Sequence, residues 1–243
     1  MAEESLGSLG LEHIDVEETR DLEELSTDCA MLGLAAVDFC EVFNPGRLSA
    51  MAAGVGLKAG TVFDLAVGWD ADSEQARDWA EKRMEKETPE FLIASPLCTP
   101  FSQMQALQDT TTERYQELLQ QCMVHLGFVV RLITVQIAAK RFFLFEHPWG
   151  AWSWGLVMIT ALLAMEGVVL VRGDQCPFGQ SIIQEDGTDM LIRKRSGWMT
   201  NSPRLAVRLG VDCDKLHPHG TLFGRQRAKE AGRYPYRLIR AIL

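Results

Sequence analysis

The sequence predicts an α/β fold, a doubly wound and mostly parallel sheet with helices on both faces. Two observations carry this prediction. Short apolar runs alternate along the chain with longer segments of helical periodicity, and the runs end at turn residues or reactive side chains. With 243 residues, of which 47% are hydrophobic, the chain suits one α/β domain with a complete core.

The predicted strands are short apolar runs bounded by turn-forming residues. Asn44-Pro45-Gly46 forms a turn after the first run, and residues 181–189 form a surface excursion. The expected strands are residues 36–43, 61–63, 91–94, 142–145 and 168–171, with a strand or hairpin over 190–200.

The predicted helices lie between these strands and after the last of them. They cover residues 47–53, 73–87, about 110–139 and, with an interruption at Tyr234-Pro235, 224–243. Ser73 is expected to cap the second helix, and Thr110 or Thr111 the third, because Ser and Thr accept hydrogen bonds from the first free amides. The third helix is assigned from apolar residues that recur at helical spacing.

The apolar run 149–171 is long enough to span a membrane. Gly167 divides it into an apolar helix and a strand, which continues the alternation of strands and helices. We therefore expect no membrane span here. The N-terminus lacks a basic region followed by an apolar run, and the six cysteines include no close pairs. An intracellular protein, nuclear or cytoplasmic and not secreted, is expected.

Charge is segregated along the chain, whose formal net charge is −9. Residues 1–30 carry −9 and are expected to form an acidic, disordered arm, followed by one domain over residues 31–243. Within that domain, residues 31–190 carry −9 and the C-terminal segment 191–243 carries +9. The basic segment predicts contact with nucleic acid, DNA being the expected partner. A solvated face that pairs with the acidic parts of the chain is the alternative.

Three of the predicted strands end in chemically useful residues, and parallel strands bring such ends to one crevice. The first strand ends at Phe43-Asn44-Pro45-Gly46, Cys98 follows the strand at 91–94, and Glu146 follows the strand at 142–145. A thiol in a strand-to-helix loop, near a helix that restarts at Phe101-Ser102, is expected to favour thiolate. The alternative for Cys98 is an ordinary small apolar side chain in a Pro-flanked loop.

Asp64 ends the second strand, 21 positions after Phe43. This separation is typical of the distance between a nucleotide-binding turn and the acid that binds a ribose hydroxyl. The sequence therefore predicts a nucleoside-containing ligand at the first two strand ends.

Three segments together resemble the cytosine carbon-5 DNA methyltransferases. Residues 95–102, SPLCTPFS, are similar to the loop of that family that carries the reactive cysteine, and Phe145-Glu146-His147-Pro148 resembles its Glu-Asn-Val motif. Residues 41–48, EVFNPGRL, are similar to its first motif. The chain is closer still to the methyltransferase-like segments of retroelement-type polyproteins, and this resemblance covers roughly residues 36–243.

The resemblance implies a Rossmann-like, S-adenosylmethionine-dependent methyltransferase. Cys98 would add to carbon-6 of a flipped cytosine, and Glu146 would hold or protonate ring nitrogen-3. Arg195 matches the base-contacting arginine of the family. Phe43 would stack on the adenine of the cofactor. Asp64 would bind its ribose hydroxyls, and Asp70 is the next candidate for that role. The remaining residues implied to line the cofactor site are Asn44, Gly46 and Pro96.

The chain also departs from the family pattern. Leu97 precedes the cysteine where the family has proline, Thr99 stands for glutamine, and His147-Pro148 replaces Asn-Val. A fold kept with its activity lost is one consequence. The other function considered is therefore a non-catalytic nucleic-acid-binding or scaffolding module of a mobile-element polyprotein.

Cys213, His217 and His219 are metal-ligating residue types at close spacing, and Cys176 could supply a fourth ligand for tetrahedral zinc. The spacing is not a standard zinc signature. Simpler roles stay open for other residues. Glu146 could pair with an arginine such as Arg141, and His147 could be packed or hydrogen-bonded. Other residues with such alternatives are Asp174 as a turn cap and Trp149, Trp152 and Trp154 as core or rim.

Overall fold

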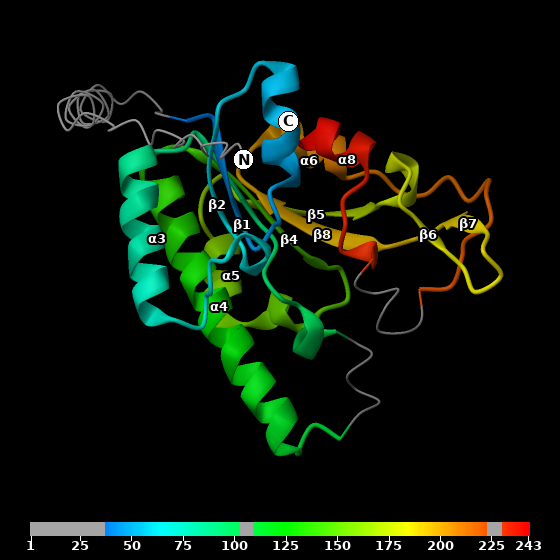
Figure 1. Ribbon diagram of the computed structural model, residues 1–243, viewed down its shortest axis with the longest axis horizontal. Helices are drawn as coiled ribbons and strands as arrows, with labels where there is room; N and C mark the ends of the chain where they lie inside the picture. The colour runs from blue at the N-terminus through cyan, green and yellow to red at the C-terminus, as the bar shows by residue number, and fades with distance from the viewer. Residues whose placement is uncertain (1–36, 103–108, 223–229) are drawn as a thin grey trace, which may run out of the picture.

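The computed structural model describes residues 37–102, 109–222 and 230–243 (Figure 1). The predicted acidic arm and the predicted domain start at residue 31 lie outside these ranges. Within them, the chain forms a six-stranded sheet with the strand order β2-β1-β3-β4-β8-β5 and a two-stranded sheet, β6-β7. The strands are β1 (Phe39–Val42), β2 (Ala59–Phe63), β3 (Phe91–Ala94), β4 (Phe142–Pro148), β5 (Val169–Asp174), β6 (Ser181–Ile183), β7 (Asp189–Leu191) and β8 (Arg195–Thr200).

The large sheet is mostly parallel, as the sequence predicts. Strand β1 pairs in parallel with β2 and β3, and β3 pairs in parallel with β4. Strand β8 lies between β4 and β5 and runs antiparallel to both. Strands β4 and β5 therefore point the same way, and the carboxyl ends of β1, β2, β3 and β4 share one edge.

Helices lie on both faces of this sheet because successive strand residues point to opposite sides. Cys40, Leu92 and Phe143 belong to one apolar cluster, whereas Phe39 and Ile93 belong to another. The first cluster includes buried residues of α3 (Glu74–Glu87), α4 (Glu113–Ala138) and α5 (Val157–Leu163). The second cluster includes buried residues of α2 (Arg47–Ala52), α6 (Pro203–Leu209) and α8 (Tyr236–Ile242). Figure 1 shows the two groups of helices on either side of the strands.

The helix starts follow capping chemistry. The side chain of Ser73 accepts from the amide of Ala76, as predicted for α3. The cap of α4 is Thr112, one or two residues beyond the predicted Thr110 or Thr111. Its hydroxyl accepts from the amide of Tyr115 at 3.4 Å. The predicted helix restart near Phe101-Ser102 is a single 3-10 turn, η3 (Thr99–Phe101), and residues 103–108 lie outside the described ranges.

The run 149–171 divides into a helix and a strand, as predicted. It forms the 3-10 turn η5 (Trp152–Gly155), then α5, and then enters β5. In the described part of the chain, α4 is the one helix long and apolar enough to cross a membrane, judged by length and composition. Core helices of other proteins meet the same criterion, so this is weak evidence of a span.

Two strand predictions need correction. Strand β4 continues through Glu146 and His147 to Pro148, because β8 pairs with its second half. Residues 190–200 split between β7 and β8, which belong to different sheets. The predicted surface excursion contains β6, which pairs with β7 as a hairpin.

Candidate functional site

The ends of β1, β3 and β4 lie side by side at the carboxyl edge of the sheet. The register pairs Val42 with Ala94 and Ala94 with Phe145. The chain passes from β1 outward to β2 and then returns to β3 on the other side of β1. Such a reversal of strand order opens a crevice between the two neighbouring strand ends, where open α/β sheets bind their ligands.

Cys98 lies at this edge, as the residue before the η3 turn, and its side chain is half-buried. Burial and, to a smaller extent, the nearby Glu146 carboxylate raise the pKa of its thiol to about 11, and Lys194 opposes this rise. The predicted preference for thiolate is therefore wrong for this structure. A three-residue 3-10 turn supplies too little helix dipole to offset the loss of solvation.

Glu146 is 6% exposed and lies within β4, beside Cys98. It accepts a hydrogen bond from Ser196 Oγ at 2.5 Å, and Lys194 Nζ lies 3.4 Å from its Oε1. The alternative of a pair with Arg141 is not what the structure shows, because Lys194 is the cation that contacts Glu146. The carboxylate is thus fixed in place by two residues that sequence reasoning did not single out.

Arg195 does not contact Glu146. Its Nε lies 3.0 Å from Asp174 Oδ1, and Arg193 Nε lies 3.9 Å from Asp174 Oδ2. Side chains alternate in an extended segment, so the two arginines face Asp174 while Lys194 between them faces Glu146. Lys194, one position earlier, is therefore the basic residue that lies against Glu146, and the contact of Arg195 with a base stays a prediction.

Asp174 is buried between these arginines and the backbone of Cys213. Burial tends to raise the pKa of its carboxyl, but hydrogen bonds from Arg195 and from the Cys213 amide, together with the two arginine charges, lower it below the ordinary value. Its second oxygen accepts from the Cys213 amide at 3.0 Å. Asp174 therefore holds a structural junction, beyond the simple turn cap considered from sequence.

His147 is fully buried and hydrogen-bonded, as one alternative from the sequence proposed. Its Nε2 lies 3.2 Å from the carbonyl oxygen of Pro96, and its Nδ1 lies 2.8 Å from Ser153 Oγ. Burial lowers the pKa of this imidazole to about 4. A neutral ring that donates to the Pro96 carbonyl from Nε2 and accepts from the Ser153 hydroxyl at Nδ1 satisfies both contacts. His147 thereby fastens the Cys98 loop to β4.

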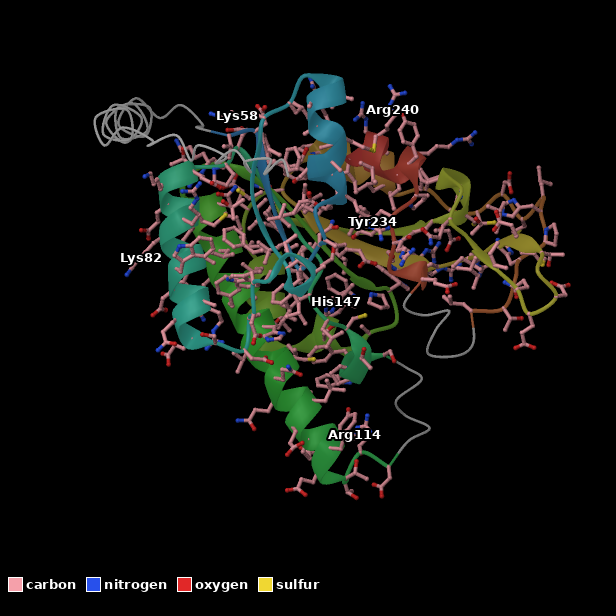
Figure 2. The ribbon with its side chains drawn as sticks, viewed as in Figure 1. Lys58, Lys82, Arg114, His147, Tyr234 and Arg240 are labelled. Atoms are coloured by element: carbon pink, nitrogen blue, oxygen red, sulfur yellow. The ribbon has the colours of Figure 1, made fainter. Side chains whose placement is uncertain are left out.

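Tyr234 closes the cluster from the end of the chain. Its hydroxyl lies 2.7 Å from Ser95 Oγ, and its ring centroid lies 5.8 Å from Lys194 Nζ. Burial raises the pKa of its phenol well above the ordinary value. In Figure 2, His147 and Tyr234 both lie near the middle of the molecule. Sequence reasoning noted Tyr234 as a helix interruption and gave it no role in the site, because its hydrogen-bond partner Ser95 is 139 residues away.

The first strand end carries the predicted cofactor residues Phe43, Asn44 and Gly46. Phe43 and Gly46 have φ of 55° and 73°, which places the turn in the left-handed region. The Phe43 ring already packs against Trp69 at 5.7 Å and His125 at 5.0 Å between ring centroids. Asn44 is buried, and its side-chain Nδ2 has no hydrogen-bond partner among the described residues. A donor left in this state is one that a bound ligand would satisfy.

The other predicted cofactor residues are spread along the same edge. Pro96 is buried beneath His147, whereas Asp64 is half-buried and Asp70 is exposed. Asp64 accepts from the Ala66 amide at 2.8 Å and Asp70 from the Asp72 amide at 3.0 Å. An open hollow of about 600 Å³ lies beside β2, and its lining does not include Cys98 or Glu146. It is lined by Thr61, Val62, Val67, Gly68, Trp69, Ala76 and Trp79.

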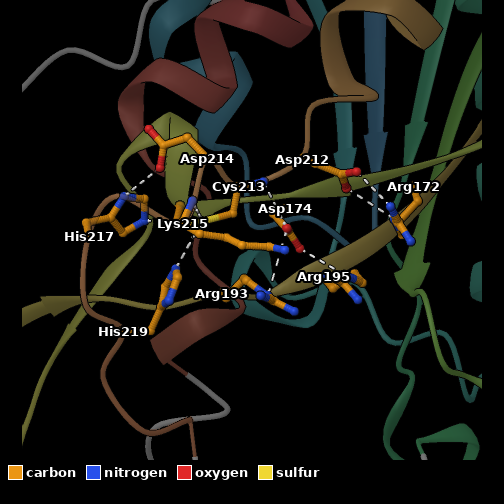
Figure 3. Close-up of polar contacts among 11 residues, drawn as sticks. Arg172, Asp174, Arg193, Arg195, Asp212, Cys213, Asp214, Lys215, His217 and His219 are labelled. Carbon is orange, nitrogen blue, oxygen red and sulfur yellow. Dashed lines mark hydrogen bonds and ion pairs between the residues drawn. The ribbon is translucent and has the colours of Figure 1, made fainter.

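The structure brings all four predicted metal ligands together. The ligand atoms of Cys176, Cys213, His217 and His219 lie within 4.8 Å of one another. Figure 3 shows three of them with Asp174 and its arginines close by. The residue types are those that hold tetrahedral zinc.

Part of the basic C-terminal segment pairs with acids of the chain, and part of it stays exposed to solvent. Arg193, Lys194 and Arg195 pair with acids of the domain. A second open hollow, of about 550 Å³, is lined by arginines and aromatic rings at α6 and α8. Its lining is Phe178, Arg208, Tyr236, Arg237, Arg240 and Ala241.

Comparison with models of known protein families finds none that matches this chain, and comparison with curated proteins finds no match either. Function is therefore inferred from the arrangement of the side chains.

Proposed function

We propose that this chain is an S-adenosylmethionine-dependent methyltransferase of the cytosine carbon-5 DNA type, or a degenerate relative of one. The observation that supports this most is the joint cluster at the ends of β3 and β4. There Cys98 interacts with Glu146, and Lys194 contacts Glu146 and lowers the pKa of the thiol. The reversal of strand order at β1 favours the doubly wound, Rossmann-like interpretation of the sheet.

The proposed chemistry uses the side chains of this cluster. Cytosine carbon-5 becomes nucleophilic when the sulfur of Cys98 bonds to carbon-6 and the carbon-5 to carbon-6 π electrons move to carbon-5. Because a thiol of pKa about 11 is protonated at neutral pH, its proton must leave as the base binds. Lys194 assists that loss to solvent, and Glu146 holds or protonates ring nitrogen-3. Once carbon-5 carries the methyl group, it loses its proton to solvent and the carbon-6 to sulfur bond breaks, which releases the methylated base and the Cys98 thiolate.

The end of β1 supports a site for the cofactor. Asn44 Nδ2, which has no hydrogen-bond partner among the described residues, offers a donor, and Asp64 follows at the end of the neighbouring β2, where the Phe43 amide donates to the Phe63 carbonyl at 2.8 Å. When bound, S-adenosylmethionine supplies the methyl group that carbon-5 accepts. Phe43, Asn44, Gly46 and Pro96 would hold it, with Asp64 or Asp70 on its ribose.

Two measurements test the proposal. Addition of S-adenosylmethionine or its demethylated product should raise the melting temperature of the chain, because a ligand of the native state stabilises it. DNA containing 5-fluorocytosine should form a covalent adduct that survives denaturation and is lost in Cys98→Ser. The absence of both the shift and the adduct would exclude catalysis at this site.

A second candidate is a non-catalytic nucleic-acid-binding module. It is favoured by the high pKa of Cys98 and by the arginine-lined hollow, in which Tyr236 is 62% exposed and available to a base. This candidate predicts salt-sensitive nucleic-acid binding that persists in both Cys98→Ser and Glu146→Gln, without a cofactor shift.

A further inference from the structure

We propose that Cys176, Cys213, His217 and His219 bind one structural zinc ion. Cys176 lies in the 3-10 turn η6 (Cys176–Phe178) after β5, and the other three lie in the segment that follows α6. The two cysteines are buried and the two histidines are half-buried. Two segments that are far apart in sequence thus present four ligand atoms to one point, and Figure 3 shows Cys213, His217 and His219 of this group.

Three of the four sulfur-to-nitrogen separations match a tetrahedral ion, and all four ligand atoms lie within 4.8 Å of one another. Zinc bonds of about 2.3 Å to sulfur and about 2.0–2.1 Å to nitrogen place the two kinds of atom about 3.5 Å apart at tetrahedral angles. Cys213 Sγ lies 3.6 Å from His217 Nε2 and 3.5 Å from His219 Nε2. Cys176 Sγ lies 3.4 Å from His219 Nε2. These three pairs therefore need little movement to accept the ion.

The groups around the ligands are oriented as a zinc site requires. His217 turns Nε2 toward the sulfur, and its Nδ1 lies 3.2 Å from Asp214 Oδ1. A carboxylate on the far ring nitrogen fixes the tautomer of a metal-bound histidine. The amide of Lys215 donates to Cys213 Sγ at 3.2 Å, and the φ of 62° at Lys215 forms the tight turn that allows it.

Charge and coordination number indicate a structural ion. Two thiolates and two neutral imidazoles balance Zn²⁺, and binding releases the two thiol protons to solvent. Four protein ligands also complete the tetrahedron, so no position stays open for water or substrate.

The ion would also hold in place the segment that carries Lys194 to Glu146. The Cys213 amide donates to Asp174, which holds Arg195, and the Gln175 amide donates to the Lys194 carbonyl at 2.9 Å. Closing the link between Cys176 and Cys213 therefore restrains the segment that carries Lys194 to Glu146. This role does not depend on methyl transfer.

Metal analysis of the full chain, purified without a His-tag, tests the proposal. One zinc per chain is expected, with loss of most of it in Cys213→Ser and in His219→Ala. Cys98→Ser is the matched control, since it removes a thiol at the proposed catalytic position and should keep its zinc. Zinc well below one per chain, or zinc unchanged in Cys213→Ser, would overturn the site.

Cobalt substitution of the unaltered chain decides the matter if those variants fail to fold. After removal of metal with a chelator, added Co²⁺ should give the intense visible bands of a tetrahedral ion with thiolate charge-transfer absorption. Added zinc should displace it and raise the melting temperature. A weak octahedral spectrum would mean that the four side chains form thiol–imidazole hydrogen bonds and no metal centre.

Discussion

Lys194 Nζ lies 3.4 Å from Oε1 of Glu146, and the two side chains act in opposite directions on the thiol of Cys98. The lysine comes from the segment that leads into β8, the glutamate from β4 and the cysteine from the loop after β3. Burial has the largest effect on the pKa of this thiol, and the charges of Glu146 and Lys194 adjust it in opposite directions.

Changing either charge should move the reactivity of Cys98 in a known direction. Glu146→Gln removes a charge that raises the pKa of the thiol, so alkylation by iodoacetamide at pH 8 should become faster. Lys194→Met removes a charge that lowers it, so alkylation should become slower. In the unaltered chain, a pKa of about 11 instead of 9.0 makes the thiolate roughly a hundredfold scarcer. Mass spectrometry of the modified peptide gives the rates, and a change in the same direction for both variants would contradict the assignment.

The lowered pKa of His147 should make the folded protein less stable in mild acid than at neutral pH. The pKa of its imidazole is about 4 in the folded chain, against 6.5 for an ordinary histidine. Between these values the unfolded chain binds a proton that the folded chain does not. The contribution is complete above pH 6.5 and is lost as pH falls toward 4, by up to about 3 kcal/mol.

Urea unfolding at pH 5 and pH 7, followed by tryptophan fluorescence, measures this loss. His147→Gln should be less stable than the unaltered chain at pH 7, by about 1–3 kcal/mol, because the Pro96 and Ser153 contacts are disturbed. It should also show a smaller difference between the two pH values. An unchanged pH difference in the variant would place the titrating group elsewhere.

Two glycines of the described chain should respond oppositely to alanine. A Cβ at Gly173 in β5 would meet the Leu209 carbonyl oxygen at 2.0 Å and Trp198 Nε1 at 2.9 Å. Gly173→Ala should therefore cost about 2–3 kcal/mol, since α6 must move away from the sheet. Gly127 in α4 has nothing within 4 Å of such an atom. Gly127→Ala should stabilise the chain by about 0.5–1 kcal/mol, and thermal melting of the pair compares them directly.

Asn44→Ala should weaken the binding of S-adenosylmethionine without lowering the stability of the free chain. The buried Nδ2 of Asn44 has no partner among the described residues, so its removal costs the free chain little. The rise in melting temperature on adding S-adenosylmethionine should fall or vanish. A full shift in the variant would mean that Asn44 does not contact the cofactor.

Charge reversal at α8 should weaken nucleic-acid binding. Arg237 and Arg240 line the basic hollow with Tyr236, and replacing both with glutamate should lower the affinity for DNA and flatten its salt dependence. Arg114→Glu is the control, because Arg114 is exposed at the far end of α4 in Figure 2. Fluorescence anisotropy at several salt concentrations compares the variants. Equal losses in the control would indicate a general charge effect.

Local pattern was enough for much of the fold. Ser73 caps α3 as predicted, and β3 has the predicted bounds of 91–94, because capping and apolar runs act over a few residues. The neighbouring ends of β1, β3 and β4 could also be foreseen, since parallel strands share their direction. The four predicted metal ligands were named from the chemistry of their side chains, and the structure places them together.

Tertiary structure alone decided which partners those residues meet. The insertion of β8 between β4 and β5 extends β4 past Glu146 and puts Lys194, not Arg195, against the carboxylate. Burial at the packed edge raises the pKa of Cys98, where a local view of the loop predicted the reverse. Both outcomes depend on side chains distant in sequence, because desolvation and ion pairing are set by what packs in space.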